Sequence, residues 1–253
     1  MSEAVCALLR ELDAWRSAQR PIRLWLRDDD AIAPGPALDR LAGLAAQFRL
    51  PVLLAVIPML AEPDLAADLA EKPLLLPCQH GAWHRNHGAP GARKSEFGVE
   101  RTLAEVEAAI GRGRKRLADL LGEAVLPIFV PPWNRIAPDH AARLPALGFA
   151  GLSCFRGFRL GPAGGPRLGH TDLDIMDWQG GRIGRGLDDM AAELAATLAA
   201  RRAAEAGGTA IGLLLHHRDH DLAGWDALAA MLALLTEHQA VTATNPRMIF
   251  GLA

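Results

Sequence analysis

The chain has 253 residues, with 27 lysines and arginines against 29 aspartates and glutamates and a net charge of -2. Half of the residues are hydrophobic and 22% are charged, a balance that excludes a largely disordered chain. The near-neutral charge excludes a broad nucleic-acid surface, which needs a strong excess of basic residues. The cysteines Cys6, Cys78 and Cys154 are far apart in the sequence, which excludes a cysteine-rich zinc site and a disulfide scaffold.

The N-terminal segment predicts a surface helix over about residues 2–18. Its apolar residues Val5, Leu8 and Leu12 fit one face of such a helix. Charged residues interrupt this segment, whereas a secretory signal needs an unbroken apolar stretch. The longest apolar run, residues 51–61, is too short to span a bilayer. We therefore expect a cytoplasmic protein that does not enter the membrane.

From residue 22 onward, short apolar runs alternate with segments rich in alanine and leucine. The runs predict buried strands and the segments between most of them predict helices, an alternation typical of a parallel sheet covered on both faces. About seven such units predict an α/β fold, with a closed or nearly closed barrel in one domain over residues 1–253. The Gly- and Pro-rich segment 156–169 predicts a loop inserted within that domain. The predicted strands are 22–26, 52–57, 74–76, 126–130, 149–153, 173–176 and 210–215, and the predicted helices are 37–48, 62–71, 99–121, 138–147, 187–204 and 222–237.

Unusual polar residues follow five of the predicted strands at or near the point where each strand ends. In parallel α/β folds the ligand site lies at the carboxyl ends of the strands, so we expect these residues to converge on one rim. The five groups are Arg27-Asp28-Asp29-Asp30, Gln79-His80 with His84 beyond it, Pro131-Pro132-Trp133-Asn134, Asp177-Trp178 and His216-His217.

Two of these groups together predict a metal site. His80 and His84 are four residues apart, a spacing that allows both imidazoles to chelate one ion. Gly81 stands where the zincin motif HEXXH has its glutamate, so that motif is excluded. The acids Asp28–Asp30 would repel one another if packed together without a cation, and one of them can supply the third ligand. Two histidines and one carboxylate make a known kind of catalytic zinc site.

A site of this kind suits hydrolysis of an amide or an ester. Zinc, or another divalent ion, lowers the pKa of bound water, a second carboxylate serves as general base, and a separate histidine protonates the leaving group. No GxGxxG or Walker loop stands at the end of a predicted strand, which excludes redox chemistry and phosphoryl transfer of those types.

The order of the five groups resembles that of the polysaccharide deacetylases, the NodB-homology or carbohydrate esterase family 4 group, over about residues 22–220. The resemblance implies a distorted (β/α)7 barrel and a zinc-dependent deacetylase. Residues 26–30 resemble the family's pair of aspartates, which implies Asp29 as the base and Asp30 as a metal ligand. The alternative register, Asp28 and Asp29, stays open.

The remaining groups are similar to the other family motifs. Residues 79–84 resemble the HxxxH motif, which implies that His80 and His84 bind the metal. Residues 130–133 resemble the Arg-Pro-Pro-aromatic motif, which implies that the Trp133 N–H holds the oxyanion, because Pro132 has no N–H. The motif DxxDW at Asp174–Trp178 implies that Asp177 orients the catalytic histidine. The last motif implies His216 as general acid, with His217 or His220 as the alternative.

One position departs from the family, because Val130 replaces the arginine that pairs with the base. Arg27 or Arg135 could replace it from a neighbouring position. The expected substrate is an N-acetylated sugar or oligosaccharide, with Trp133 and Trp178 placed to stack on sugar rings. Two alternatives stay open: a carbohydrate-binding barrel without catalysis, and an amidohydrolase that cleaves a small non-sugar C–N bond, including a small acetylated amide.

Overall fold

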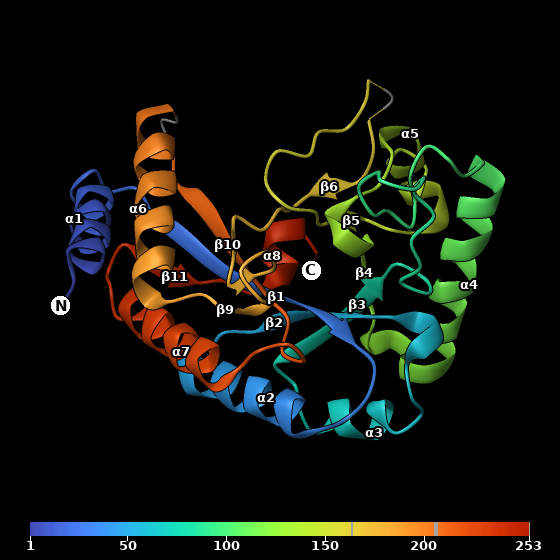
Figure 1. Ribbon diagram of the computed structural model, residues 1–253, viewed down its shortest axis with the longest axis horizontal. Coiled ribbons are helices and arrows are strands. Elements are labelled where there is room, and N and C mark those ends of the chain that lie inside the picture. Colours follow the sequence, from blue (N-terminus) through green and yellow to red (C-terminus); the bar gives the residue numbers. More distant parts are fainter. Residues whose placement is uncertain (163, 205–206, 253) are drawn as a thin grey trace.

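The computed structural model describes residues 1–162, 164–204 and 207–252 (Figure 1). Within these residues nine strands form one sheet in the order β6-β5-β4-β3-β2-β1-β10-β7, and β11 also pairs with β1. All of these pairs are parallel, and β6 and β7 lie at the two free edges. Because the sheet keeps two free edges, it does not close on itself and forms a half-barrel. Its strands are β1 (Ile22–Ala31), β2 (Val52–Val56), β3 (Leu75–His80), β4 (Leu126–Val130), β5 (Gly151–Leu152), β6 (Arg167–Leu168), β7 (Leu173–Asp174), β10 (Thr209–Leu215) and β11 (Val241–Ala243).

Helices pack around the sheet. Helix α1 packs against α6, and Arg202 of α6 forms an ion pair with Glu11 of α1 at 2.7 Å. Helix α4 begins with a capping box, in which Thr102 and Glu105 satisfy each other's backbone N–H groups. The helices are α1 (Glu3–Ser17), α2 (Pro36–Phe48), α3 (Leu65–Ala70), α4 (Leu103–Leu121), α5 (Pro138–Ala141), α6 (Leu187–Ala204), α7 (Leu222–Thr236) and α8 (Pro246–Phe250), with 3-10 turns at Pro58–Leu60, Gly122–Ala124, Pro132–Asn134 and Leu144–Leu147.

The two faces of β1 enter different hydrophobic clusters. Leu24 and Leu26 belong to the large cluster under α1, α2, α6 and α7. Trp25 belongs to a separate cluster on the opposite face, where its ring meets Phe250 of α8 edge to face at 5.9 Å. Because side chains alternate along a strand, Arg27 and Asp29 follow the side of Trp25, and Asp28 follows the side of Leu26.

The sequence prediction of an α/β fold with a parallel barrel-like sheet is confirmed. The boundaries differ most at the site. Strand β1 runs five residues beyond its predicted end, through all three acids, and β3 runs on to His80. The segment 173–176 divides, because β8 (Met176–Asp177) leaves the sheet and pairs with β9 (Ile183–Gly184) in an antiparallel hairpin.

Three further boundaries differ. The predicted insertion 156–169 includes β6, which pairs with β5, and residue 163 lies outside the described residues. The predicted helix 138–147 is two short turns, and the predicted helix 62–71 shortens to α3. Strand β11 and helix α8 were not predicted. No described helix combines the length and apolar character needed to cross a membrane.

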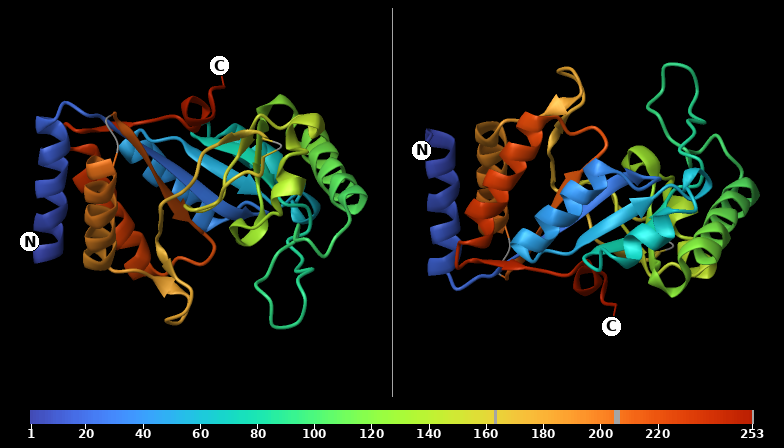
Figure 2. Two further views of the ribbon diagram at one scale, coloured as in Figure 1. Left: turned by 90° about the horizontal axis from the view of Figure 1, so that it is seen from above. Right: turned by 90° about the horizontal axis from the view of Figure 1, so that it is seen from below.

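The segment around residues 85–95 and the β8–β9 hairpin project from the same side of the molecule, as both views in Figure 2 show. The two segments flank the carboxyl ends of the central strands.

Candidate metal centre and active site

A pocket of about 920 Å³ opens at the carboxyl ends of the strands. The structure thus brings most of the predicted site residues to one rim. Arg27, Asp28, Pro132 and His217 lie behind the pocket wall and do not line it. The predicted residues that line it are Asp29, Asp30, His80, His84, Trp133, Arg135, Asp174, Asp177, Trp178 and His216.

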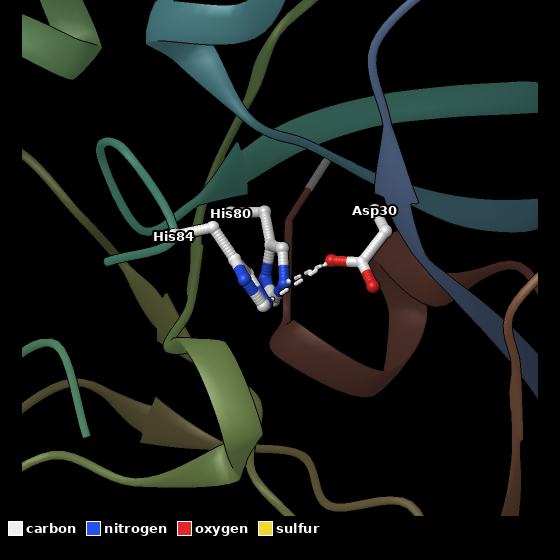
Figure 3. A group of neighbouring side chains, drawn as sticks. All are labelled: Asp30, His80 and His84. Carbon is white, nitrogen blue, oxygen red and sulfur yellow. Dashed lines mark ion pairs between the residues drawn. The ribbon is translucent and has the colours of Figure 1, made fainter. Parts of the chain in front are cut away.

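Asp30, His80 and His84 form a compact group of metal-ligating side chains (Figure 3). The Nε2 atoms of His80 and His84 lie 3.1 and 3.2 Å from Asp30 Oδ1. Asp30 Oδ1 is buried and accepts no well-aligned hydrogen bond within the described part of the chain. Two imidazole nitrogens and one carboxylate oxygen facing a common point suit a divalent ion such as zinc. The donor set therefore fits the ion that the sequence predicts.

A bulge in β1 places Asp30 beside Asp29. The pairing of β1 with β2 shifts register between Asp28 and Ala31, and Asp30 has a left-handed backbone (φ 72°). In a regular strand, neighbouring side chains point to opposite faces, so Asp29 and Asp30 would not share a pocket. The bulge brings both into it, whereas Asp28 stays on the other face.

A backbone contact sets the protonation of His80. Its Nδ1 lies 3.0 Å from the carbonyl oxygen of Val130, which can only accept, so Nδ1 carries the proton. Nε2, which faces Asp30, is then the ring nitrogen available to bind a metal ion. Hydrogen bonds of this kind orient the histidine ligands of metal sites.

Glu96, which the sequence analysis missed, supports the loop that carries His84. Its buried carboxylate accepts hydrogen bonds from the backbone N–H groups of Ala82 (3.1 Å), Trp83 (2.8 Å) and His84 (3.2 Å). Gly81 passes close by with φ 56°, and a Cβ there would lie 2.3 Å from Glu96 Oε2. No spacing rule links a glutamate to amides twelve to fourteen residues earlier, so the sequence carried no signal for this contact.

The charges around Asp30 favour its ionised form. Burial opposes ionisation, but the close imidazole of His80, followed by those of His84 and His216, holds the pKa of Asp30 well below its ordinary value. Burial and the neighbouring His80 lower the pKa of His84, which favours the neutral ligand form. Asp29 and Asp30 outweigh burial at His80 and raise its pKa.

Arg27 pairs with Asp29. Arg27 Nε and Nη2 lie 2.9 and 3.0 Å from the two carboxylate oxygens of Asp29, and the Arg27 side chain is fully buried. Its remaining N–H groups donate to Ser153 Oγ at 2.7 Å and Asn134 Oδ1 at 2.5 Å. Of the two arginines left open by the sequence, Arg27 is the one that pairs with Asp29.

Arg135 takes no part in that pairing. Its Nη1 donates to the carbonyl oxygen of Lys94 at 3.0 Å, on the outer wall of the pocket.

Asp28 forms a separate buried pair with His217. Asp28 Oδ2 accepts the His217 backbone N–H at 2.8 Å, and Asp28 Oδ1 lies 2.5 Å from His217 Nδ1. This pair joins the end of β1 to the end of β10 behind the pocket. His216, the neighbouring residue, lines the pocket, and its ring meets Trp178 edge to face at 4.6 Å. The alternation of side chains along the chain thus separates the two histidines.

The predicted contact between Asp177 and His216 is not formed. Asp177 Oδ1 accepts the backbone N–H groups of Gln179 (3.1 Å) and Gly180 (2.7 Å) and so closes the turn of the β8–β9 hairpin. His216 Nδ1 is buried and has no hydrogen-bond partner among the described residues. In this structure Asp177 therefore stabilises the turn of its own hairpin through Oδ1, and its predicted role toward His216 stays a prediction.

Asp174 lines the same pocket as His216. Burial raises the pKa of Asp174, while the charge of His216 opposes that rise. Asp174 also accepts hydrogen bonds from the Trp178 Nε1 (2.8 Å) and the Met176 N–H (3.0 Å). It therefore fixes Trp178, whose ring contacts His216.

His220 supports the end of β10. Its Nε2 accepts the backbone N–H of His216 at 3.1 Å. Burial lowers its pKa to about 4, with His216 and His217 contributing. His220 is thus neutral at neutral pH, which disfavours it as a proton donor.

Trp133 lines the pocket beside Asp30, His80 and His84. Its ring lies 4.4 Å from that of His84, centroid to centroid, and its backbone is left-handed (φ 54°). Trp178 stands on the hairpin side of the same pocket and is 37% exposed. Two aromatic rings thus face the pocket from different elements.

Solved structures with the same architecture include several deacetylases and esterases. No protein-family model matches the sequence, and no curated protein matches it. The chain superposes on Puue allantoinase with a TM-score of 0.66 and 16% identity, over 92% of this chain and 90% of that one. It superposes on a family 4 carbohydrate esterase from Streptomyces lividans, solved in complex with acetate, with a TM-score of 0.55 and 15% identity, over 87% and 91%. For the Bc1960 peptidoglycan N-acetylglucosamine deacetylase the values are 0.57 and 13%, over 95% and 97%.

Proposed function

We propose that this chain, which has the NodB-like fold of polysaccharide deacetylases and family 4 carbohydrate esterases, is a metal-dependent hydrolase. Its proposed reaction is the removal of an acetyl group from an N-acetylated sugar or oligosaccharide. The observation that carries this proposal is the placement of the Asp30–His80–His84 group beside an arginine-bound carboxylate, Asp29, in one pocket.

Asp30, His80 and His84 would hold the ion, and zinc suits their donor atoms. When bound, such an ion supplies a Lewis acid that polarises the acyl carbonyl and activates water. Asp29 accepts the proton of the attacking water. Arg27 holds the Asp29 carboxylate in the position from which it acts as a base.

The remaining residues act on the developing charges. The Trp133 backbone N–H donates to the oxyanion of the tetrahedral intermediate. His216 protonates the departing amine, with Asp174 and Trp178 as its neighbours. The rings of Trp133 and Trp178 provide apolar faces for a sugar.

The structure weakens one alternative and leaves another for experiment. A binding barrel without catalysis drew its support from the missing arginine at position 130, but Arg27 pairs with Asp29. A hydrolase that cleaves a small non-sugar C–N bond keeps support, because Puue allantoinase is among the similar structures.

The test is hydrolysis by the zinc-loaded protein of two panels, N-acetylated sugars and small amides that include allantoin. Acetate release from the sugars, lost in Asp29→Asn, is the expected result. Turnover of the amide panel alone would transfer the assignment to the second candidate, and turnover of neither panel would contradict both.

A further inference from the structure

Five cationic side chains line the pocket, and three of them form ion pairs with neighbouring carboxylates. Arg156 and Arg185 share Glu193 at 2.5 and 2.7 Å. Arg182 pairs with Asp219 at 3.2 Å. These three lie on the side of the β8–β9 hairpin and α6. The five cations are Lys94, Arg135, Arg156, Arg182 and Arg185.

Lys94 and Arg135 have no such partner. Neither forms an ion pair with a carboxylate in the part of the chain that the structure describes. The one side-chain hydrogen bond of Arg135 runs from Nη1 to the carbonyl oxygen of Lys94, so its other N–H groups stay available. Burial and the nearby Arg93 lower the pKa of Arg135, as expected for a half-buried cation without a counter-charge.

The two cations lie beside the candidate metal centre. Trp133 separates them from it, with the His84 ring 4.4 Å from the Trp133 ring and Lys94 Nζ 6.0 Å from its centroid. Arg135 follows Trp133 by two residues. Lys94 belongs to the segment around residues 85–95, which directly follows His84, a candidate metal ligand, and precedes Glu96.

An uncompensated, half-buried guanidinium is costly unless a ligand supplies the missing negative charge. A guanidinium and an ammonium that line the same pocket suit a carboxylate or a phosphate, which can accept charge-assisted hydrogen bonds from both. A sugar stacked on Trp133 would carry its substituents past the metal ligands on one side and these cations on the other.

We propose that Lys94 and Arg135 form a subsite for an oxyanion carried by the substrate, so that the acetylated sugar is a uronic acid or a sugar phosphate. One part of this inference rests on the proposed deacetylation: the assignment of the bound anion to the substrate of that reaction. The anion subsite itself can be measured without turnover.

Binding is measured by isothermal titration of the zinc-loaded protein with inorganic phosphate and, separately, with glucuronate. The variants are Lys94→Gln/Arg135→Gln and a matched control, Lys115→Gln, whose side chain pairs with Asp119 on α4 away from the pocket. We expect saturable binding of at least one anion, weakened about 10-fold or more in the double variant and unchanged in the control. Preference for phosphate or for glucuronate identifies which anion the substrate carries.

Turnover is measured in parallel with N-acetylglucosamine, its 6-phosphate and the corresponding uronic acid. We expect kcat/KM to favour an anionic sugar, and the double substitution to reduce that preference about 10-fold or more. Anion binding that survives the double substitution, as binding to the metal alone would, overturns the subsite, and so does an absence of saturable binding. Anion binding that depends on Lys94 and Arg135, without deacetylation of any sugar, retains the subsite and refutes the proposed function.

Discussion

At the scale of single residues, the neighbouring histidines His216 and His217 have different environments. His216 lines the pocket, whereas His217 is bound to the buried Asp28. We predict that His216→Ala lowers kcat by about 10²–10⁴-fold with the metal retained. His217→Ala instead leaves Asp28 buried without its partner and should destabilise the fold by about 3–5 kcal/mol. Steady-state kinetics and urea denaturation separate the two effects, and near-normal kcat in His216→Ala would remove it from the mechanism.

The Arg27–Asp29 pair makes a second residue-scale prediction. Arg27→Gln leaves a buried carboxylate without its bidentate partner, so the free energy of unfolding should fall by about 3–5 kcal/mol. Arg143→Gln is the matched control, because the Arg143–Glu107 pair is on the surface and should contribute less than about 1 kcal/mol. Equal losses in the two variants would contradict the buried pair. Restored stability in Arg27→Gln/Asp29→Asn would support it further.

His220 predicts a dependence of stability on pH. Burial lowers its folded-state pKa from 6.5 to about 4, so the unfolded chain binds more protons between these values. Its contribution to stability is therefore present above pH 6.5 and is lost as the pH falls toward 4, up to about 3 kcal/mol. We expect His220→Gln to flatten the stability profile in this window. An unchanged slope between pH 6.5 and 4 would show that His220 is protonated in the folded protein.

At the scale of elements, the loop from Gly81 to Glu96 links the fold to the candidate metal centre. Glu96 holds three amides of this loop, so Glu96→Gln should weaken metal binding by about 10–100-fold, and Glu96→Ala by more. The measurement is the metal dissociation constant from chelator competition. Glu100→Gln, an exposed glutamate four residues on, is the control and should bind the metal like the native chain. Native affinity in Glu96→Ala would show that His84 needs no such support.

The sequence predicted the main strands better than the bulge in β1 and the hairpin formed by β8 and β9. Apolar runs mark the buried strands β1, β2, β4 and β10, because strands covered on both faces have few polar residues. The bulge at Asp30 could not be read from three identical acids, so the register stayed open until the pairing with β2 was known. The hairpin turn that Asp177 stabilises was not predicted, because no local pattern marks where a short strand leaves a sheet.

At the scale of the whole molecule, the half-barrel explains why the site residues come from distant parts of the sequence. Parallel strands place all their carboxyl ends on one rim, so acids of β1, histidines of and after β3, and His216 after β10 meet there. The bulge then decides which two of the three acids enter the pocket. Asp29 and Asp30 therefore have different proposed roles, base and metal ligand, although they are adjacent in the sequence.

The zinc content of purified Asp29→Asn and Asp30→Asn proteins, measured by mass spectrometry, tests this assignment most directly. We predict that the native protein and Asp29→Asn each hold one ion per chain, and that Asp29→Asn has no deacetylase activity. Asp30→Asn should lose most of its zinc. An Asp29→Asn protein without zinc, together with an Asp30→Asn protein that keeps one ion per chain, would contradict it.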